Sequence, residues 1–145
     1  MQIQRSSLLA TALLAAAALG CGGESPGPTT YPVTGVVTQN GQPVAGAVIQ
    51  FTPTAADSTA SAQAQTAADG TFTVEITFDK GRTTQPGLPA GDYKVTITKM
   101  QAPAGAPSLA RPPKNSLPPK YAMVESTPLN ATVKAEGENR FEYPL

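Results

Sequence analysis

The sequence predicts an all-β domain, a seven-stranded β-sandwich that follows a signal peptide and a flexible tether. Three observations favour this class. The chain of 145 residues contains 15 prolines and 13 glycines but only 14% charged residues, which suits short strands and many turns rather than helices. From Tyr31 onwards, apolar and polar residues alternate with a period of two. Turn pairs such as Asn40-Gly41 and Asp69-Gly70 separate the alternating runs.

The first strands are expected on both sides of a tight hairpin. Val33, Gly35 and Val37 alternate with more polar neighbours. Asn40-Gly41 then supplies the two positive φ angles that a two-residue hairpin requires. Beyond the turn, alternate residues place one apolar set on a common face: Ala47, Ile49 and Phe51.

The middle of the chain begins with a weak pattern and continues with the clearest one. Residues 54–68 contain no large apolar side chain, so we expect a loose loop followed by a weak edge strand near 62–66. After Asp69-Gly70 the alternation is regular and predicts one buried and one solvated face. The positions expected to be buried are Phe72, Val74, Ile76 and Phe78.

Three further strands follow the same rule. Their inward positions are Tyr93, Val95 and Ile97 in the first, Leu129, Ala131 and Val133 in the second, and Phe141 and Tyr143 in the third. A turn at Gly137 separates the last two. A single sheet would leave its apolar face in water, whereas burial of one Val, Ile or Phe contributes roughly 1.5–3 kcal/mol. We therefore expect two packed sheets.

The first twenty residues are predicted to be a signal peptide. Arg5 precedes an apolar run over residues 8–19. A helix of this length would span roughly 18 Å, which is too short for a hydrocarbon core of about 30 Å. Gly20-Cys21 resembles the end of a bacterial lipoprotein signal, in which the cysteine is lipidated, although Ala18-Leu19 reverses the usual order. Residues 21–30 then read as the lipidated cysteine and its tether. An ordinary secretory signal is the alternative.

Residues 31–145 carry motifs in an order that resembles the carboxypeptidase regulatory-like domain. The motifs are V-x-G-x-V (Val33, Gly35, Val37), G-x-P-x-x-G-A (Gly41, Pro43, Gly46, Ala47), D-G-x-F (Asp69, Gly70, Phe72) and G-x-Y (Gly91, Tyr93). The resemblance implies a transthyretin-like Greek-key sandwich without catalytic activity. The later "LPPKYA" and the last strand are similar to small lipoproteins of planctomycete-type bacteria. Gly35 and Gly46 are expected inside strands at a bulge or close crossing, and the buried Tyr93 is expected to find a hydroxyl partner.

The composition argues against several classes of activity. The chain has no histidine, which excludes triads that depend on an imidazole base. Asp69 and Asp92 adjoin turn glycines and Glu75 lies on the wet face of a strand, so a carboxylate enzyme is disfavoured. No D-x-D-x-D-G spacing supports calcium. With 10 basic and 10 acidic residues there is no case for nucleic acid. We expect no enzyme, no cofactor and no metal.

The most promising binding segment is a proline-rich loop at 102–120. Such a long connection without secondary structure is often functional or disordered, and polyproline geometry would hold it extended. Between Tyr93 and Val124 the charged residues are all basic: Lys94, Lys99, Arg111, Lys114 and Lys120. Arg111, Lys114 and Lys120 are the candidate contacts for an anionic partner. A merely solvated loop is the other interpretation.

The leading hypothesis is an exported protein, lipid-anchored through Cys21 to the membrane of the bacterial envelope, in the outer membrane or at the cell surface. Its β-sandwich would act as a structural or interaction module toward an envelope protein or polymer. The alternative is an exported domain that binds a glycan or small ligand. Tyr31 and Tyr121 are the only rings without an expected inward position. A hydrolase built on carboxylates is the third hypothesis.

Overall fold

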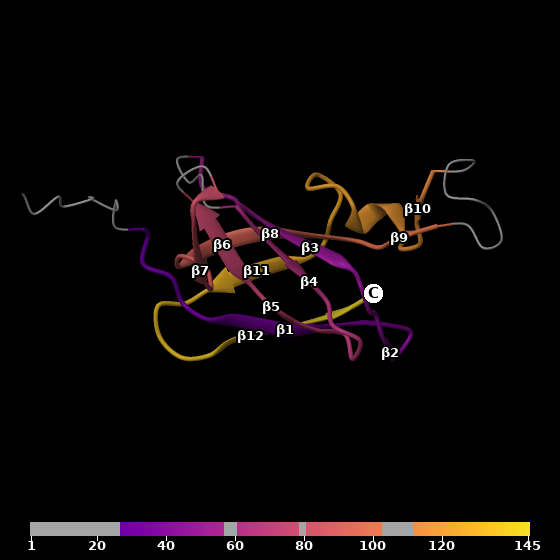
Figure 1. Ribbon diagram of the computed structural model, residues 1–145, viewed down its shortest axis with the longest axis horizontal. Helices are drawn as coiled ribbons and strands as arrows, with labels where there is room; N and C mark the ends of the chain where they lie inside the picture. Colours follow the sequence, from indigo (N-terminus) through magenta and orange to yellow (C-terminus); the bar gives the residue numbers. More distant parts are fainter. Residues whose placement is uncertain (1–26, 57–60, 79–80, 103–111) are drawn as a thin grey trace, which may run out of the picture.

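The computed structural model describes residues 27–56, 61–78, 81–102 and 112–145 and is all-β, as predicted (Figure 1). The larger sheet contains, in spatial order, β11 (Asn130–Val133), β8 (Gly91–Thr98), β3 (Val48–Pro53), β4 (Ala62–Gln65), β6 (Glu75–Phe78) and β7 (Thr83–Pro86). The smaller sheet contains β12 (Asn139–Pro144), β1 (Val33–Gln39) and β2 (Gln42–Pro43), with β5 (Thr71–Thr73) also paired to β1. A ribbon of β9 (Met100–Gln101) and β10 (Lys114–Asn115), and the 3-10 helix η2 (Pro119–Tyr121), complete the described elements.

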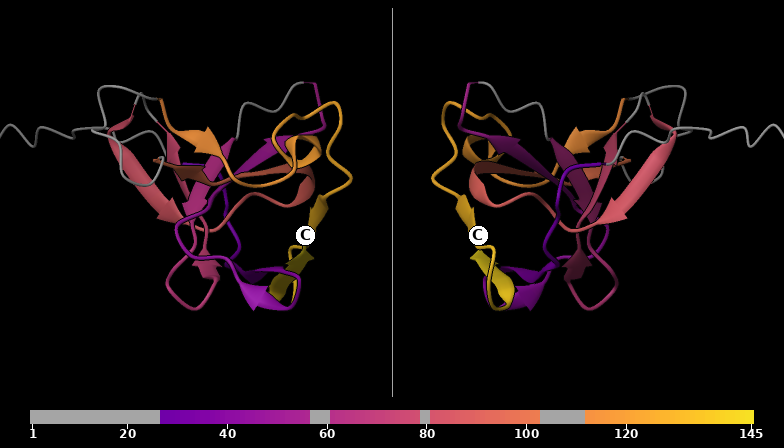
Figure 2. Two further views of the ribbon diagram at one scale, coloured as in Figure 1. Left: turned by 90° about the vertical axis from the view of Figure 1, so that its right-hand side faces the viewer. Right: turned by 90° about the vertical axis from the view of Figure 1, so that its left-hand side faces the viewer.

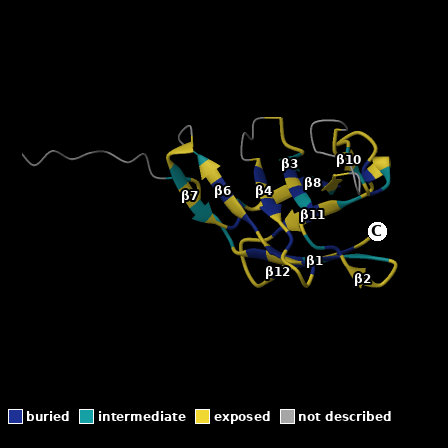
Figure 3. Cartoon of the chain, turned by 45° about the vertical axis from the view of Figure 1, so that its right-hand side comes forward, coloured by how far each residue is buried: buried dark blue, intermediate teal, exposed yellow. Residues whose placement is uncertain are grey.

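The two main sheets form a sandwich whose inner faces are apolar. Alternate residues along the strands are buried and exposed, which gives the banding of Figure 3. Both sheets contribute to one core that includes Val33 and Tyr143 from the smaller sheet and Ile49 and Ile97 from the larger. Figure 2 shows the two layers from the ends, with violet β1 and yellow β12 together on the lower side. The inward positions expected for Ile49, Phe51, Val95 and Ile97 are confirmed.

The described residues form twelve strands, more than the seven expected. The long alternating run after Asp69 explains part of the difference. It breaks at Val74, where the chain passes from β5 in the smaller sheet to β6 in the larger sheet. Val74 itself is fully buried, and its N–H donates to the Val33 carbonyl at 3.0 Å. The side-chain alternation continues through the crossing, so periodicity alone could not locate it.

The weak strand at 62–66 is not an edge strand, so that expectation is wrong. It becomes β4, which lies between β3 and β6. Its pairing with β6 is limited to a single residue pair, Gln63 with Glu75. The edges of the larger sheet are β11 and β7. The inward residues of this strand, Ala62 and Ala64, are small, so the sequence did not indicate that the strand is central.

Three glycines show how the local sequence sets the backbone. A Cβ at Gly35 would lie 2.2 Å from the Phe141 carbonyl oxygen, so the expected close crossing is confirmed there. Asn40 and Gly41 have φ angles of 51° and 77°, as the predicted hairpin requires. Gly46 lies in a turn with φ of 67° rather than inside a strand, so that placement was wrong.

No helix within the described ranges is long and apolar enough to cross a membrane.

Candidate functional site

The end of the predicted tether is attached to the sandwich. Cys21 and residues 22–26 lie outside the described residues, as does Arg111. Gly27 lies against the ring of Phe78 at the end of β6, and the Thr30 hydroxyl donates to the Pro86 carbonyl in β7 at 2.9 Å. Tyr31 then forms an antiparallel bridge with Leu88, with N···O distances of 2.8 and 3.0 Å. Residues 27–31 are therefore fixed at the β6–β7 end.

The described part of the proline-rich loop is folded, so the expectation of an extended, structureless connection is wrong for residues 112–120. Lys114 and Asn115 form β10, which pairs with β9. The Asn115 side-chain oxygen accepts from the backbone N–H of Lys99 at 2.9 Å and of Leu117 at 3.2 Å. The Ser116 N–H donates to the Lys99 carbonyl at 2.9 Å. The Asn115 side chain thus links the segment after β8 to the segment that precedes η2.

Two buried side chains hold the same segment on the sandwich. Leu117 belongs to the main core, and the elements β8 and η2 contact each other. Tyr121, which had no expected inward position, has only 6% of its surface exposed. The ammonium of Lys120 lies 4.7 Å from the centroid of the Tyr121 ring, within the range of a cation–π contact.

We call residues 99–102 and 112–126 the distal lobe. In Figure 1 the β9–β10 ribbon of this lobe lies at the opposite end of the long axis from the indigo segment where the described chain begins. Its charged residues are Lys99, Lys114, Lys120 and Glu125. Lys114 and Lys120 are exposed, so the structure brings two of the three predicted basic contacts onto one lobe. The third, Arg111, lies outside the described residues.

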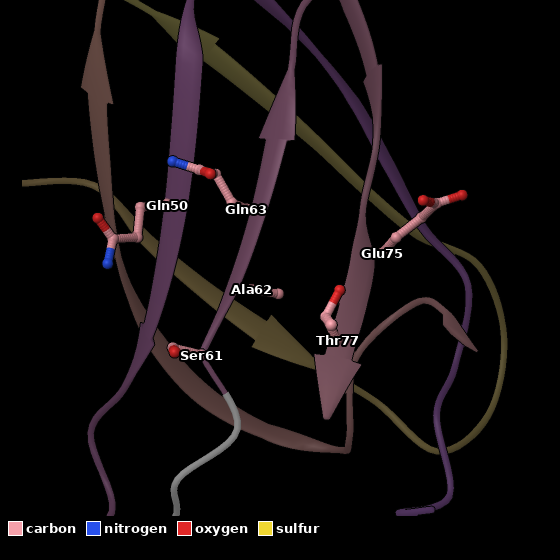
Figure 4. A pocket seen from close by; sticks show the side chains of 6 residues that line it. All are labelled: Gln50, Ser61, Ala62, Gln63, Glu75 and Thr77. Carbon is pink, nitrogen blue, oxygen red and sulfur yellow. The ribbon is translucent and has the colours of Figure 1, made fainter. Parts of the chain in front are cut away.

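A separate polar hollow of about 420 Å³ lies on the outer face of the larger sheet. It forms beside the single residue pair that joins β4 to β6. Figure 4 shows its lining residues: Gln50, Ser61, Ala62, Gln63, Glu75 and Thr77. The lining holds one carboxylate and no aromatic ring. It therefore offers neither the carboxylate pair of a hydrolase nor the stacking platform of a typical glycan site.

The acidic residues near the turns have structural partners. The Asp69 carboxylate accepts hydrogen bonds from the Thr71 hydroxyl at 2.7 Å and the Thr71 N–H at 3.0 Å, and these bonds lower its pKa. The Asp92 carboxylate accepts from the Thr132 hydroxyl at 2.6 Å across β8 and β11. Within the described ranges, no three His, Cys, Asp or Glu side chains gather as metal ligands would.

Tyr93 and Tyr143, which lie in strands β8 and β12, are part of the hydrophobic core. The expected partner for Tyr93 is present, because its hydroxyl donates to the Pro89 carbonyl at 2.9 Å. Burial raises the pKa of Tyr93, and burial also raises the pKa of Tyr143 well above its usual range.

Sequence reasoning missed the exposed apolar residues of the distal lobe. Met100, Met123 and Val124 are 59%, 53% and 37% exposed. No sequence signal marked them, because large apolar residues are by default assigned to a core.

No family model, no curated protein and no solved structure matches this chain.

Proposed function

We propose that the protein is a lipid-anchored component of the bacterial envelope whose β-sandwich is a non-catalytic interaction module. The observation that carries the proposal is the position of Cys21, directly after an apolar run and six residues before the docked Gly27. An acyl anchor at Cys21 would hold the β6–β7 end toward the bilayer. The distal lobe would then face away from the membrane.

The same proposal includes membership of the carboxypeptidase regulatory-like domains. The motif glycines support it by their backbone roles. Gly41 and Gly70 adopt positive φ angles in turns, and Gly35 permits close approach of β12 and the ring of Phe72. The two-layer arrangement of short strands is compatible with a transthyretin-like sandwich.

The anchor is tested by mass spectrometry of the mature N-terminus and by detergent-phase partitioning of the full chain. We expect Cys21 to become the first residue and to carry acyl chains, because each buried CH₂ contributes about 0.8 kcal/mol to membrane binding. Cys21→Ser should move the protein to the aqueous phase. Ser25→Ala, a neighbouring control, should leave partitioning unchanged. A free thiol at the N-terminus of the membrane fraction would overturn the proposal.

A second candidate function is binding of a glycan or small polar ligand by an exported, unacylated domain. The polar hollow favours it, since its amide and hydroxyl groups can form hydrogen bonds with a sugar. The test is an NMR titration of the Cys21→Ser chain with a panel of oligosaccharides. Shifts confined to Gln50, Gln63 and Thr77, and abolished by Gln63→Ala, would support this candidate. Unchanged spectra across the panel would count against it.

A further inference from the structure

We infer that the distal lobe is a docking surface for a partner protein whose contact face combines apolar and acidic side chains. The inference rests on the proposed function, because the lobe faces outward when Cys21 holds the opposite end. Three observations carry it: the exposed apolar side chains, the local charge and the rigid attachment of the lobe.

The exposed apolar side chains are concentrated on the lobe. Among the described residues, the large hydrophobic side chains that remain exposed are Met100, Met123 and Val124, and all three belong to it. Met123 and Val124 are adjacent in the chain, and exposed apolar groups that lie together mark interaction sites more often than single ones. Methionine is common at such surfaces because its flexible thioether adapts to the shape of a partner.

Among the described residues, the net charge of the lobe is opposite in sign to that of the rest of the domain. The lobe has three lysines and one glutamate. The remaining described residues have four basic side chains and six acidic ones. These basic residues are Arg82, Lys94, Lys134 and Arg140, and the acidic ones are Asp69, Glu75, Asp92, Glu136, Glu138 and Glu142. Acidic side chains on the partner would be attracted to the lobe and would be repelled by the rest of the domain.

The lobe is held in place before any partner arrives. The Asn115 hydrogen bonds, the buried Leu117 and the contact of Lys120 with the Tyr121 ring fix its backbone and one of its cations. A surface that is already ordered loses less conformational entropy on binding. The lobe is therefore a preorganised platform rather than a loop that folds on contact.

A protein explains these features better than a lipid or a phosphate polymer does. A polymer of phosphates would use the lysines and leave the methionines without a role. A bilayer would use both, but the β6–β7 end, where the described chain begins, and the β9–β10 ribbon of the lobe lie at opposite ends of the long axis (Figure 1). The membrane proposed to hold Cys21 would therefore lie away from the lobe.

The test is site-specific photo-crosslinking of the full chain in the cells that produce it. p-Benzoylphenylalanine replaces Met123 in one variant and, as a control, the exposed Glu136 between β11 and β12 in another. We expect a discrete protein adduct from position 123 alone. Mass spectrometry of the crosslinked peptide should show Asp or Glu beside large apolar residues.

Charge reversal supplies the second measurement. Lys114→Glu with Lys120→Glu should lower the adduct yield about tenfold at low salt, because rim charges govern the rate of association. Lys134→Glu with Arg140→Glu, two exposed residues outside the lobe, is the matched control and should change the yield by less than about twofold. Thermal unfolding verifies that each variant is folded.

Several outcomes would overturn the inference: no protein adduct, equal adducts at both positions, or a yield unaffected by charge reversal. Sedimentation of the Cys21→Ser chain with phosphatidylglycerol vesicles or with polyphosphate tests the other occupants. Lysine-dependent binding to either, without a protein adduct, would assign the lobe to that source instead. The acylation state, measured in the same cells, separates the two proposals. An acylated chain without an adduct overturns only this inference, and an adduct on an unacylated chain overturns only the anchor.

Discussion

Phe51 in β3 and Phe72 in β5 meet across the two sheets, with ring centroids 6.2 Å apart and planes inclined at 47°. Phe51 also contacts Tyr93 edge-on at 6.4 Å, and Phe72 stacks on Tyr143 at 6.2 Å. A chain of four aromatic rings therefore joins the larger sheet to the smaller one. Each ring has at most 4% of its surface exposed.

Phe72→Ala should destabilise the domain by about 3–5 kcal/mol, because it removes a buried ring and leaves a cavity between the sheets. Urea unfolding of the Cys21→Ser chain measures this change. Thr73→Ala, the exposed neighbour in β5, should cost less than about 1 kcal/mol. An equal loss of unfolding free energy in the two variants would contradict a major role of the four aromatic rings in stability.

Gly35→Ala should destabilise the smaller sheet by about 2 kcal/mol or more, because the new methyl group would meet the Phe141 backbone oxygen and the Phe72 ring. The oxygen belongs to a paired strand and cannot move without disturbing β12. Thermal unfolding measures the loss. Thr34→Ala, at the adjacent exposed position of β1, serves as the control and should stay close to the parent stability.

Asn115→Ala should loosen the distal lobe. The Lys99 and Leu117 N–H groups would lose their acceptor, which costs about 1–3 kcal/mol locally when such a group stays buried. Hydrogen exchange at these two amides should accelerate, whereas exchange in β3 should not change. Asn115→Asp retains the acceptor oxygen and should restore much of the protection. Unchanged exchange in Asn115→Ala would show that the lobe does not depend on this side chain.

Asp69 should make stability depend on pH in the acidic range. Its hydrogen bonds from Thr71 hold the folded-state pKa below the ordinary value of 3.8, so the folded state favours the carboxylate. The contribution is present above the unfolded-state pKa and is lost as the pH falls through the folded-state pKa. A carbon-13 titration of the carboxyl group should show the lowered pKa. Thr71→Ala should return it toward 3.8, and an unaltered titration in that variant would contradict the assignment.

The sequence was a good guide wherever one strand or turn determines the outcome. Side-chain alternation placed Ile49 and Val95 inside, and Asn40-Gly41 located the first hairpin, because these features depend on neighbours along the chain. The transfer between sheets at Val74 and the central position of β4 depend on pairing between distant segments. Alternation carries no information on which strand lies beside which.

The sequence predicted the basic charge of the distal lobe but not how its backbone folds. Lys114 and Lys120 stood out because their segment lacks acidic residues. The proline-rich segment packs onto β9 because the Asn115 side chain accepts a hydrogen bond from the backbone of Lys99. This contact joins residues 16 positions apart and leaves no local pattern in the sequence. Met100 and Met123 could be recognised as surface residues only after the core had been filled by others.

The parallel pairing of β1 with β12 brings Val33 beside Asn139, about a hundred residues further along the chain. The smaller sheet therefore cannot close until residues 139–144 have been synthesised, and contacts of such long range slow folding. Deletion of residues 140–145, which contain most of β12, should accordingly destabilise the whole of the smaller sheet.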